Sequence, residues 1–229
     1  MKRLNILWIG LISILMTACY DDYEKDYDKS SVYFASQKPL RTLVADTDMS
    51  IKVGVAIGGK REVHTDDWAT FEIDPSLLDG TGLTLMPENY YQLANPNKMT
   101  ISNPNLAIAD VKVTFSDAFY EDDDALNKHY AIPFRLIDHN QDEISTDVNG
   151  NLKDYSIVVV KFVSQYHGTY FVKGKVTNLS TQQVTEYSNK DLSQNMTRDF
   201  VSLGRNKVRR PGFGNTLENN ESVNLTVNP

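Results

Sequence analysis

The sequence predicts an all-β protein: a β-sandwich followed by a second, incomplete β domain. Tyrosine and phenylalanine are frequent, at 12 and 9 of 229 residues, and both favour strands. From residue 30 onward apolar and polar residues alternate with period two, and no sustained 3.6-residue pattern occurs. Turns rich in Gly, Asn, Asp and Pro separate the alternating runs, which is typical of a sandwich of many short strands.

The chain begins with a predicted signal peptide, residues 1–18. Lys2 and Arg3 form a charged start, and the apolar run LNILWIGLISILM occupies residues 4–16. This run is too short to span a bilayer, which needs roughly 20 residues, but it fits the core of a secretory signal. Small residues then lead to Cys19, the only cysteine of the chain, so no disulfide can form within it.

Cys19 is the predicted lipidation site. The segment before it resembles bacterial lipoprotein signals, whose lipobox ends in the modified cysteine. The resemblance implies a diacylglyceryl group on Cys19 and an acylated amine, and two or more acyl chains hold a protein stably on a membrane. An ordinary secretory signal with an incidental cysteine is the alternative.

Residues 19–30 form a predicted acidic tether. Five of the ten residues in YDDYEKDYDK, 20–29, are Asp or Glu, so this run cannot bury itself. It resembles the surface-export signal of Bacteroidetes lipoproteins, which implies a protein that is anchored in the outer membrane and faces the cell exterior. The alternative is an ordinary spacer that faces the periplasm.

The predicted first domain, residues 31–164, holds the clearest strand patterns. The run 156–163 is apolar on both faces and predicts a central strand. Pro133 lies within the run 130–136, which predicts an edge or bulged strand. Asn149-Gly150 and its neighbours predict a hairpin turn between 132–137 and 155–163, and residues 117–128 predict one short helical turn. The other alternating apolar positions are 49, 51, 53, 55, 57, 111, 113 and 115.

The predicted second domain, residues 165–229, alternates at 170–176 and again at 223–227. With about 60 residues and no disulfide it is thin for an independent sandwich. We therefore expect it either to dock on the first domain or to be incomplete.

The net charge is −7, and removal of Lys2 and Arg3 makes it −9. A nucleic-acid partner is not expected, because phosphate binding needs clustered Lys and Arg. The short basic cluster of Arg205, Lys207 and the pair 209–210 is predicted to be a solvated loop, with an anion site as the alternative.

No catalytic or metal-binding motif is found, so we expect neither an enzyme nor a cofactor or metal. The four histidines have no metal-ligand spacing. The run 138–142 opens like a calcium loop, but Glu143 replaces the required Gly and Asn149 replaces the bidentate Glu, so a polar loop is expected, with a looser calcium site as the alternative. The acidic run 121–124 is expected to be a solvated loop, with weak cation binding as the alternative.

Sugar binding needs exposed aromatic faces that pack on the apolar face of a pyranose, with amides and carboxylates nearby for its hydroxyls. The candidate glycan-binding residues are Trp68, Tyr90, Tyr91 and Tyr120. For each of them packing in the core, or a half-buried place on a strand, is the competing interpretation.

Five short segments beyond residue 30 follow one another in a recognisable order: SVYF (31–34), MPENYY (86–91), VKVTF (111–115), YAIPFRL (130–136) and RPGFGNT (210–216). On these segments the chain resembles the amino-terminal domain of Bacteroidetes surface lipoproteins from polysaccharide-utilisation loci, followed by the start of a second domain. The resemblance implies an immunoglobulin-like sandwich that binds glycans beside an outer-membrane importer, and it implies no catalytic residues. A structural or adhesive surface protein that acts through protein partners is the alternative function.

Overall fold

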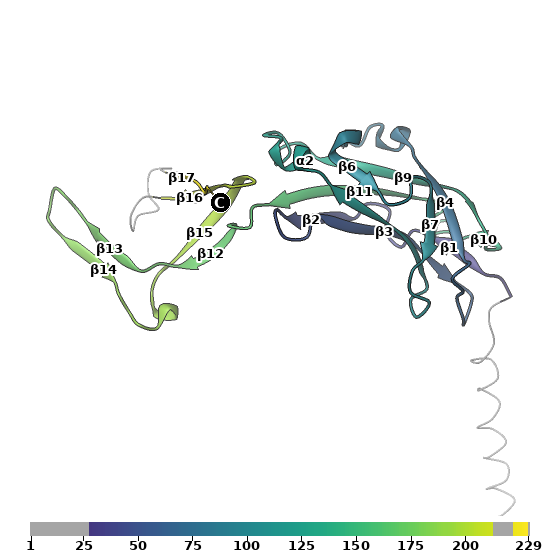
Figure 1. Cartoon of the computed structure of the whole chain (residues 1–229), viewed down its shortest axis with the longest axis horizontal. Helices are drawn as coiled ribbons and strands as arrows, with labels where there is room; N and C mark the ends of the chain where they lie inside the picture. The colour runs from purple at the N-terminus through teal and green to yellow at the C-terminus, as the bar shows by residue number, and fades with distance from the viewer. Residues whose placement is uncertain (1–27, 213–221, 229) are drawn as a thin grey trace, which may run out of the picture.

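The structure is a computed structural model that describes residues 28–212 and 222–228. The predicted signal peptide, Cys19 and the tether as far as residue 27 lie outside the described residues. Within those residues the chain is nearly all β, with strands in three sheets (Figure 1), which confirms the predicted all-β fold. No helix in this part of the chain is long and apolar enough to cross a bilayer.

The largest sheet has eleven strands and forms the sandwich. Its path is β10-β1-β3-β8-β7-β4-β9-β11-β2, with β5 beside β9 and β6 beside β8. The strands are β1 (Ser31–Tyr33), β2 (Leu40–Val44), β3 (Ser50–Gly58), β4 (Trp68–Ile73), β5 (Thr84–Leu85), β6 (Tyr91–Leu93), β7 (Lys98–Ile101), β8 (Ile108–Phe115), β9 (Tyr130–His139), β10 (Glu143–Ile144) and β11 (Tyr155–Val163). Three short helices connect them: η1 (Pro75–Leu78), η2 (Glu88–Tyr90) and α2 (Asp117–Glu121). Helix α2 confirms the predicted helical turn.

The sheet curls so that its parts enclose one core. Val53 on β3, Val111 on β8, Phe134 on β9 and Phe162 on β11 all belong to the same cluster of buried side chains. The alternating pattern predicted the positions on β3, β8 and β9, because successive side chains of a strand point to opposite faces of its sheet. The two layers of the predicted sandwich are therefore parts of one continuous sheet.

Strand β11 is central, as its sequence predicts. It lies between β9, with which it is antiparallel, and β2, with which it is parallel. Val158 faces the main core, whereas Ile157 packs on the other face with Leu78 and Ala131. The predicted hairpin between β9 and β11 is also confirmed, and Gly150 in its turn has a φ of 83°, a conformation that favours glycine.

Pro133 was predicted to mark an edge or bulged strand, and the edge placement is wrong, because β9 lies between β4 and β11. Strand β9 is bulged, but at Ile137 and not at the proline: the adjacent residues Thr70 and Phe71 of β4 pair with Asp138 and Leu136, so Ile137 is the extra residue. The proline is tolerated because β4 ends at Ile73. Beyond that point the Pro133 carbonyl accepts a bond from the Asp74 N–H at 2.9 Å, and no strand there requires a donor from residue 133.

The chain after β11 forms two smaller sheets. The four-stranded sheet has the order β12-β15-β16-β17, and β13 pairs with β14 in a separate ribbon. The bounds are β12 (Gly168–Phe171), β13 (Gly174–Thr177), β14 (Val184–Tyr187), η3 (Leu192–Gln194), β15 (Thr197–Gly204), β16 (Lys207–Pro211) and β17 (Ser222–Thr226). Among the described residues of this region Val208 is the one buried hydrophobic side chain. The division into domains at 164 and 165 stays a prediction.

Candidate functional site

Of the sequence-predicted site residues, Cys19 lies outside the described residues, and the four aromatic candidates lie in different environments. Trp68 is half-buried at the start of β4. The Lys98 ammonium lies 4.8 Å from the centre of its ring, so a cation already covers one aromatic face. Trp68 lines neither the pocket that contains Tyr91 nor the pocket that contains Tyr120.

Tyr120 is not an exposed platform: of the two interpretations that the sequence left open for it, the structure shows packing in the core. Its side chain is 2% exposed and belongs to the main core. The ring packs edge-on against Phe162 and Phe119, with centroids 5.1 and 5.2 Å away. Consecutive helical residues are about 100° apart, so one turn of α2 directs both Phe119 and Tyr120 into the core although the acidic run 121–124 follows directly.

Tyr90 and Tyr91 are adjacent but face different surroundings. Tyr90, at the end of η2, packs its ring edge-on against Tyr130 at 5.6 Å and tilted against Phe119 at 6.0 Å. Burial, with the neighbouring Asp122, raises the pKa of Tyr90 above its ordinary value. Both rings are half-buried and pack against the main core, but Tyr91 also lines a pocket on the surface of the sandwich.

The Tyr91 pocket has a volume of about 430 Å³. This volume lies within the usual range for small-molecule sites, roughly 300–1,000 Å³. Its wall is mostly apolar, with one aromatic ring, one carboxylate and one amide. The lining residues are Ile73, Pro75, Leu85, Met86, Glu88, Tyr91, Gln92, Leu93 and Pro96.

The polar groups of the Tyr91 pocket come from η2 and β6, which are fastened to β8. Tyr91 pairs with Phe115 in the β6–β8 ladder. The Ser116 N–H donates to the Tyr90 carbonyl at 2.9 Å, and the Ser116 hydroxyl donates to the Asn89 carbonyl at 2.7 Å. Since β8 belongs to the core, these bonds place Glu88, Tyr91 and Gln92 on a rigid support.

The electrostatics of the Tyr91 pocket favour hydrogen bonding over acid–base chemistry. Burial, followed by the nearby Glu88 carboxylate, raises the pKa of Tyr91 above its ordinary value. The phenol therefore stays protonated at neutral pH and can donate a hydrogen bond. Glu88 is an acceptor, and the Gln92 amide both donates and accepts.

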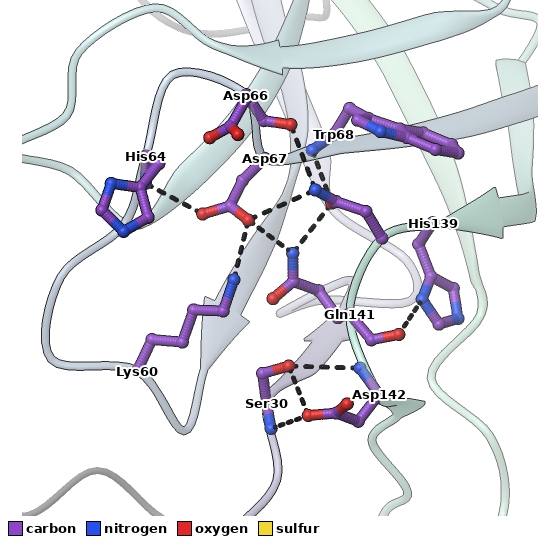
Figure 2. Close-up of polar contacts among 10 residues, drawn as sticks. Ser30, Lys60, His64, Asp66, Asp67, Trp68, His139, Gln141 and Asp142 are labelled. Atoms are coloured by element: carbon purple, nitrogen blue, oxygen red, sulfur yellow. Dashed lines mark hydrogen bonds and ion pairs between the residues drawn. The ribbon is translucent and has the colours of Figure 1, made fainter.

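A second polar cluster surrounds the buried carboxylate of Asp67, which is 2% exposed (Figure 2). Lys60 forms an ion pair with it at 2.8 Å, the His64 N–H donates at 2.9 Å, and the Gln141 amide donates at 2.8 Å. Burial raises the pKa of the Asp67 carboxyl, but these bonds outweigh burial and leave the pKa below its ordinary value. The cluster joins the loop before β4 to the loop after β9.

The polar loop expected at 138–142 serves this structural cluster. The Asn140 side-chain oxygen accepts from the Trp68 N–H at 2.9 Å. The Asp142 carboxylate accepts from both the N–H and the hydroxyl of Ser30 at 2.7 Å (Figure 2). The last residue of the predicted tether is thus fastened to the sandwich. Among the described residues no group of three or more His, Cys, Asp or Glu side chains could hold a metal ion.

The basic cluster was predicted to be a solvated loop, but its first residue, Arg205, contacts the sandwich. Arg205 forms ion pairs with Asp46 at 2.5 Å and with Asp117 at 2.8 Å, and both of these residues belong to the sandwich. Hydrogen bonding to Asp46 raises the pKa of Arg205 further above its ordinary value. Sequence reasoning missed this contact because 159 residues separate Arg205 from Asp46. The acidic residues of α2 gave the only sequence signal for it.

Fold and geometry define an all-β sandwich protein with an aromatic-lined pocket. A family model described as "-like, N-terminal domain" matches residues 27–143, which is more than half of the chain. The chain therefore belongs to this family and carries its N-terminal domain. No curated protein sequence matches the chain.

Among solved structures, a protein of unknown function from Bacteroides ovatus is similar, with a TM-score of 0.68 and 21% identity over 88% of this chain and 73% of that one. At this identity the likeness shows a shared fold. A second protein of unknown function from Bacteroides ovatus has a TM-score of 0.44 and 12% identity over 82% and 61% of the two chains. An auxiliary nutrient binding protein from Bacteroides thetaiotaomicron has a TM-score of 0.46 and 10% identity over 85% and 68%. The last two likenesses are too distant to support a conclusion.

Proposed function

We propose that this chain is a surface lipoprotein of the outer membrane that binds glycans as an accessory to polysaccharide capture and import. The observation that carries the proposal is the Tyr91 pocket. A pyranose packs its apolar face on an aromatic ring and gives its hydroxyls to nearby polar groups. In this pocket Tyr91 supplies the ring, and Glu88 and Gln92 supply the polar groups.

Tyr91→Ala is expected to weaken polysaccharide binding at least about 10-fold, because the substitution removes the one aromatic ring of the pocket. The measurement is affinity gel electrophoresis of the chain from residue 20 onward, in gels that contain host or dietary polysaccharides. The wild type should be retarded by one class of polysaccharide, and the Tyr91→Ala variant should migrate as it does in an empty gel.

Tyr33→Ala is the matched control. Tyr33 is also half-buried on the sandwich, but it lies under Lys153, 4.2 Å from its ring, and outside the Tyr91 pocket. The control variant should be retarded as strongly as the wild type. The proposal fails if no polysaccharide retards the wild type, or if the Tyr91→Ala and Tyr33→Ala variants behave alike.

The proposed anchor has its own test. Cys19→Ala is expected to abolish metabolic palmitate labelling and to leave the protein unprocessed or released from membranes, because the thiol that would carry the lipid is lost. Labelling and membrane fractionation of the expressing bacterium measure both effects. A processed Cys19→Ala protein that still fractionates with the outer membrane would contradict the anchor.

The second candidate function is a structural or adhesive surface lipoprotein that acts through protein contacts. The four-stranded sheet favours it, because this sheet presents a shallow apolar face with partly exposed aromatic rings. Tyr170, Phe171 and Leu225 on this face are 43%, 50% and 40% exposed. The gel experiment separates the two functions, since contacts of this kind predict no retardation by polysaccharide.

A further inference from the structure

A further pocket lies where the sandwich meets the four-stranded sheet. Its volume is about 680 Å³. One wall comes from α2 and the acidic run after it, and the other comes from the turn between β15 and β16 and the end of β17. Figure 1 shows α2 on the side of the sandwich that faces these strands. Neither part of the chain forms this junction pocket alone.

Arg205 fixes the two walls of the junction pocket relative to each other. Its guanidinium bonds both oxygens of Asp46, forms an ion pair with Asp117, and lies 5.8 Å from the centre of the Tyr120 ring. Two parallel bonds between a guanidinium and a carboxylate restrict orientation as well as distance. The pocket is thus formed before any ligand arrives, which lowers the entropic cost of binding.

Two polar atoms at the junction pocket have no partner. The Tyr120 hydroxyl, on a side chain that is 2% exposed, and the Asn206 side-chain oxygen are buried without a hydrogen bond among the described residues. A buried polar group that lacks a partner destabilises the fold, and such groups are rare in native structures. A phenol can donate and accept, and an amide oxygen accepts, so a ligand hydroxyl would complement both.

The net negative charge of the junction pocket disfavours an anionic ligand. The positive charge of Arg205 is already balanced by Asp46 and Asp117. What remains on the lining is the acidic run of residues 121–123 against the single ammonium of Lys207. A phosphate, a sulfate or a uronic acid would be repelled, whereas an uncharged polyhydroxylated ligand would not.

We propose that the junction pocket is a second carbohydrate site, separate from the Tyr91 pocket, which binds an uncharged sugar unit between the two sheets. The Tyr120 hydroxyl and the Asn206 side chain are its hydrogen-bonding groups. That the ligand is a carbohydrate rests on the proposed function, but the residues of the junction pocket are different from those of the Tyr91 pocket.

The test is an NMR titration of the full chain in detergent with glucose, galactose, mannose and N-acetylglucosamine, and with glucuronic acid as the anionic comparison. The amide signals of Asp123 and Asn206, on opposite walls, should shift together with one uncharged sugar and remain unchanged with glucuronic acid. Tyr120→Phe and Asn206→Ala should each raise the apparent Kd about 10-fold. Tyr120→Phe should still fold, since it removes only a hydroxyl that has no partner.

Tyr91→Ala separates this proposal from the proposed function, because it should leave the titration of Asp123 and Asn206 unchanged. The junction site is overturned if none of the four sugars shifts both amides, or if the Tyr120→Phe and Asn206→Ala variants bind as the wild type does. It is also overturned if Tyr91→Ala alone abolishes the shifts. The proposed function fails separately, through the gel experiment.

Discussion

Phe119→Ala is expected to lower the free energy of unfolding of the sandwich by about 3–5 kcal/mol, as large-to-small substitutions of buried aromatic residues do. Phe119 is fully buried, and its ring is the centre of the aromatic cluster. Its neighbours include Phe115 at 5.6 Å and Phe162 at 5.4 Å, which come from different parts of the sheet. Alanine would leave a cavity between α2, β8 and β11.

Urea unfolding followed by the fluorescence of Trp68 measures this effect, because Trp68 lies in the sandwich and is the only tryptophan after the predicted signal peptide. Leu106→Ala is the control. Leu106 is 54% exposed in the loop before β8, so its substitution should change the free energy of unfolding by less than about 0.5 kcal/mol. Equal unfolding midpoints for the two variants would show that Phe119 is not part of a packed core.

Arg205→Met is expected to free the four-stranded sheet from the sandwich. The substitution keeps an aliphatic side chain over Tyr120 but removes every ion pair of Arg205. Most of the stabilisation that is lost comes from the ion pair with Asp46. The side chains of Asp117 and Glu121 are 65% and 70% exposed, so water screens their ion pairs with Arg205. We expect the contact between the two parts to weaken by about 2 kcal/mol.

Small-angle X-ray scattering and limited proteolysis report the Arg205→Met effect. The radius of gyration should rise, and cleavage between residues 164 and 168 should become faster. Arg209→Met is the matched control, since Arg209 is exposed on β16 and pairs with neither Asp46 nor Asp117. Identical scattering and cleavage for the two variants would contradict the role given to Arg205.

The sequence predicted those parts of the fold that depend on local patterns. Alternation identified the core positions of β3, β8 and β9 because the period of two is a property of each strand alone. The position of Pro133 could not be predicted in this way. Whether a proline interrupts a ladder depends on where the neighbouring strand ends, and β4 ends at Ile73, opposite the next residue of β9.

The candidate site was predictable in part. Tyr91 was one of the four aromatic candidates and lines a pocket, but the apolar residues of that pocket come from several elements between Ile73 and Pro96, whose packing against one another is not visible in the local pattern. For Tyr120 the sequence left an exposed ring and core packing open, because the choice depends on the orientation of the single turn of α2, which directs the ring into the core. The contact of Arg205 with Asp46 depends on tertiary packing, which local patterns do not encode.

A crystal structure of the protein with an oligosaccharide from the retarding polysaccharide would show whether the Tyr91 pocket binds glycans. We expect one sugar ring stacked on Tyr91, with its hydroxyls bonded to Glu88 and Gln92. An oligosaccharide bound elsewhere on the sandwich, with the Tyr91 pocket unoccupied, would contradict this expectation.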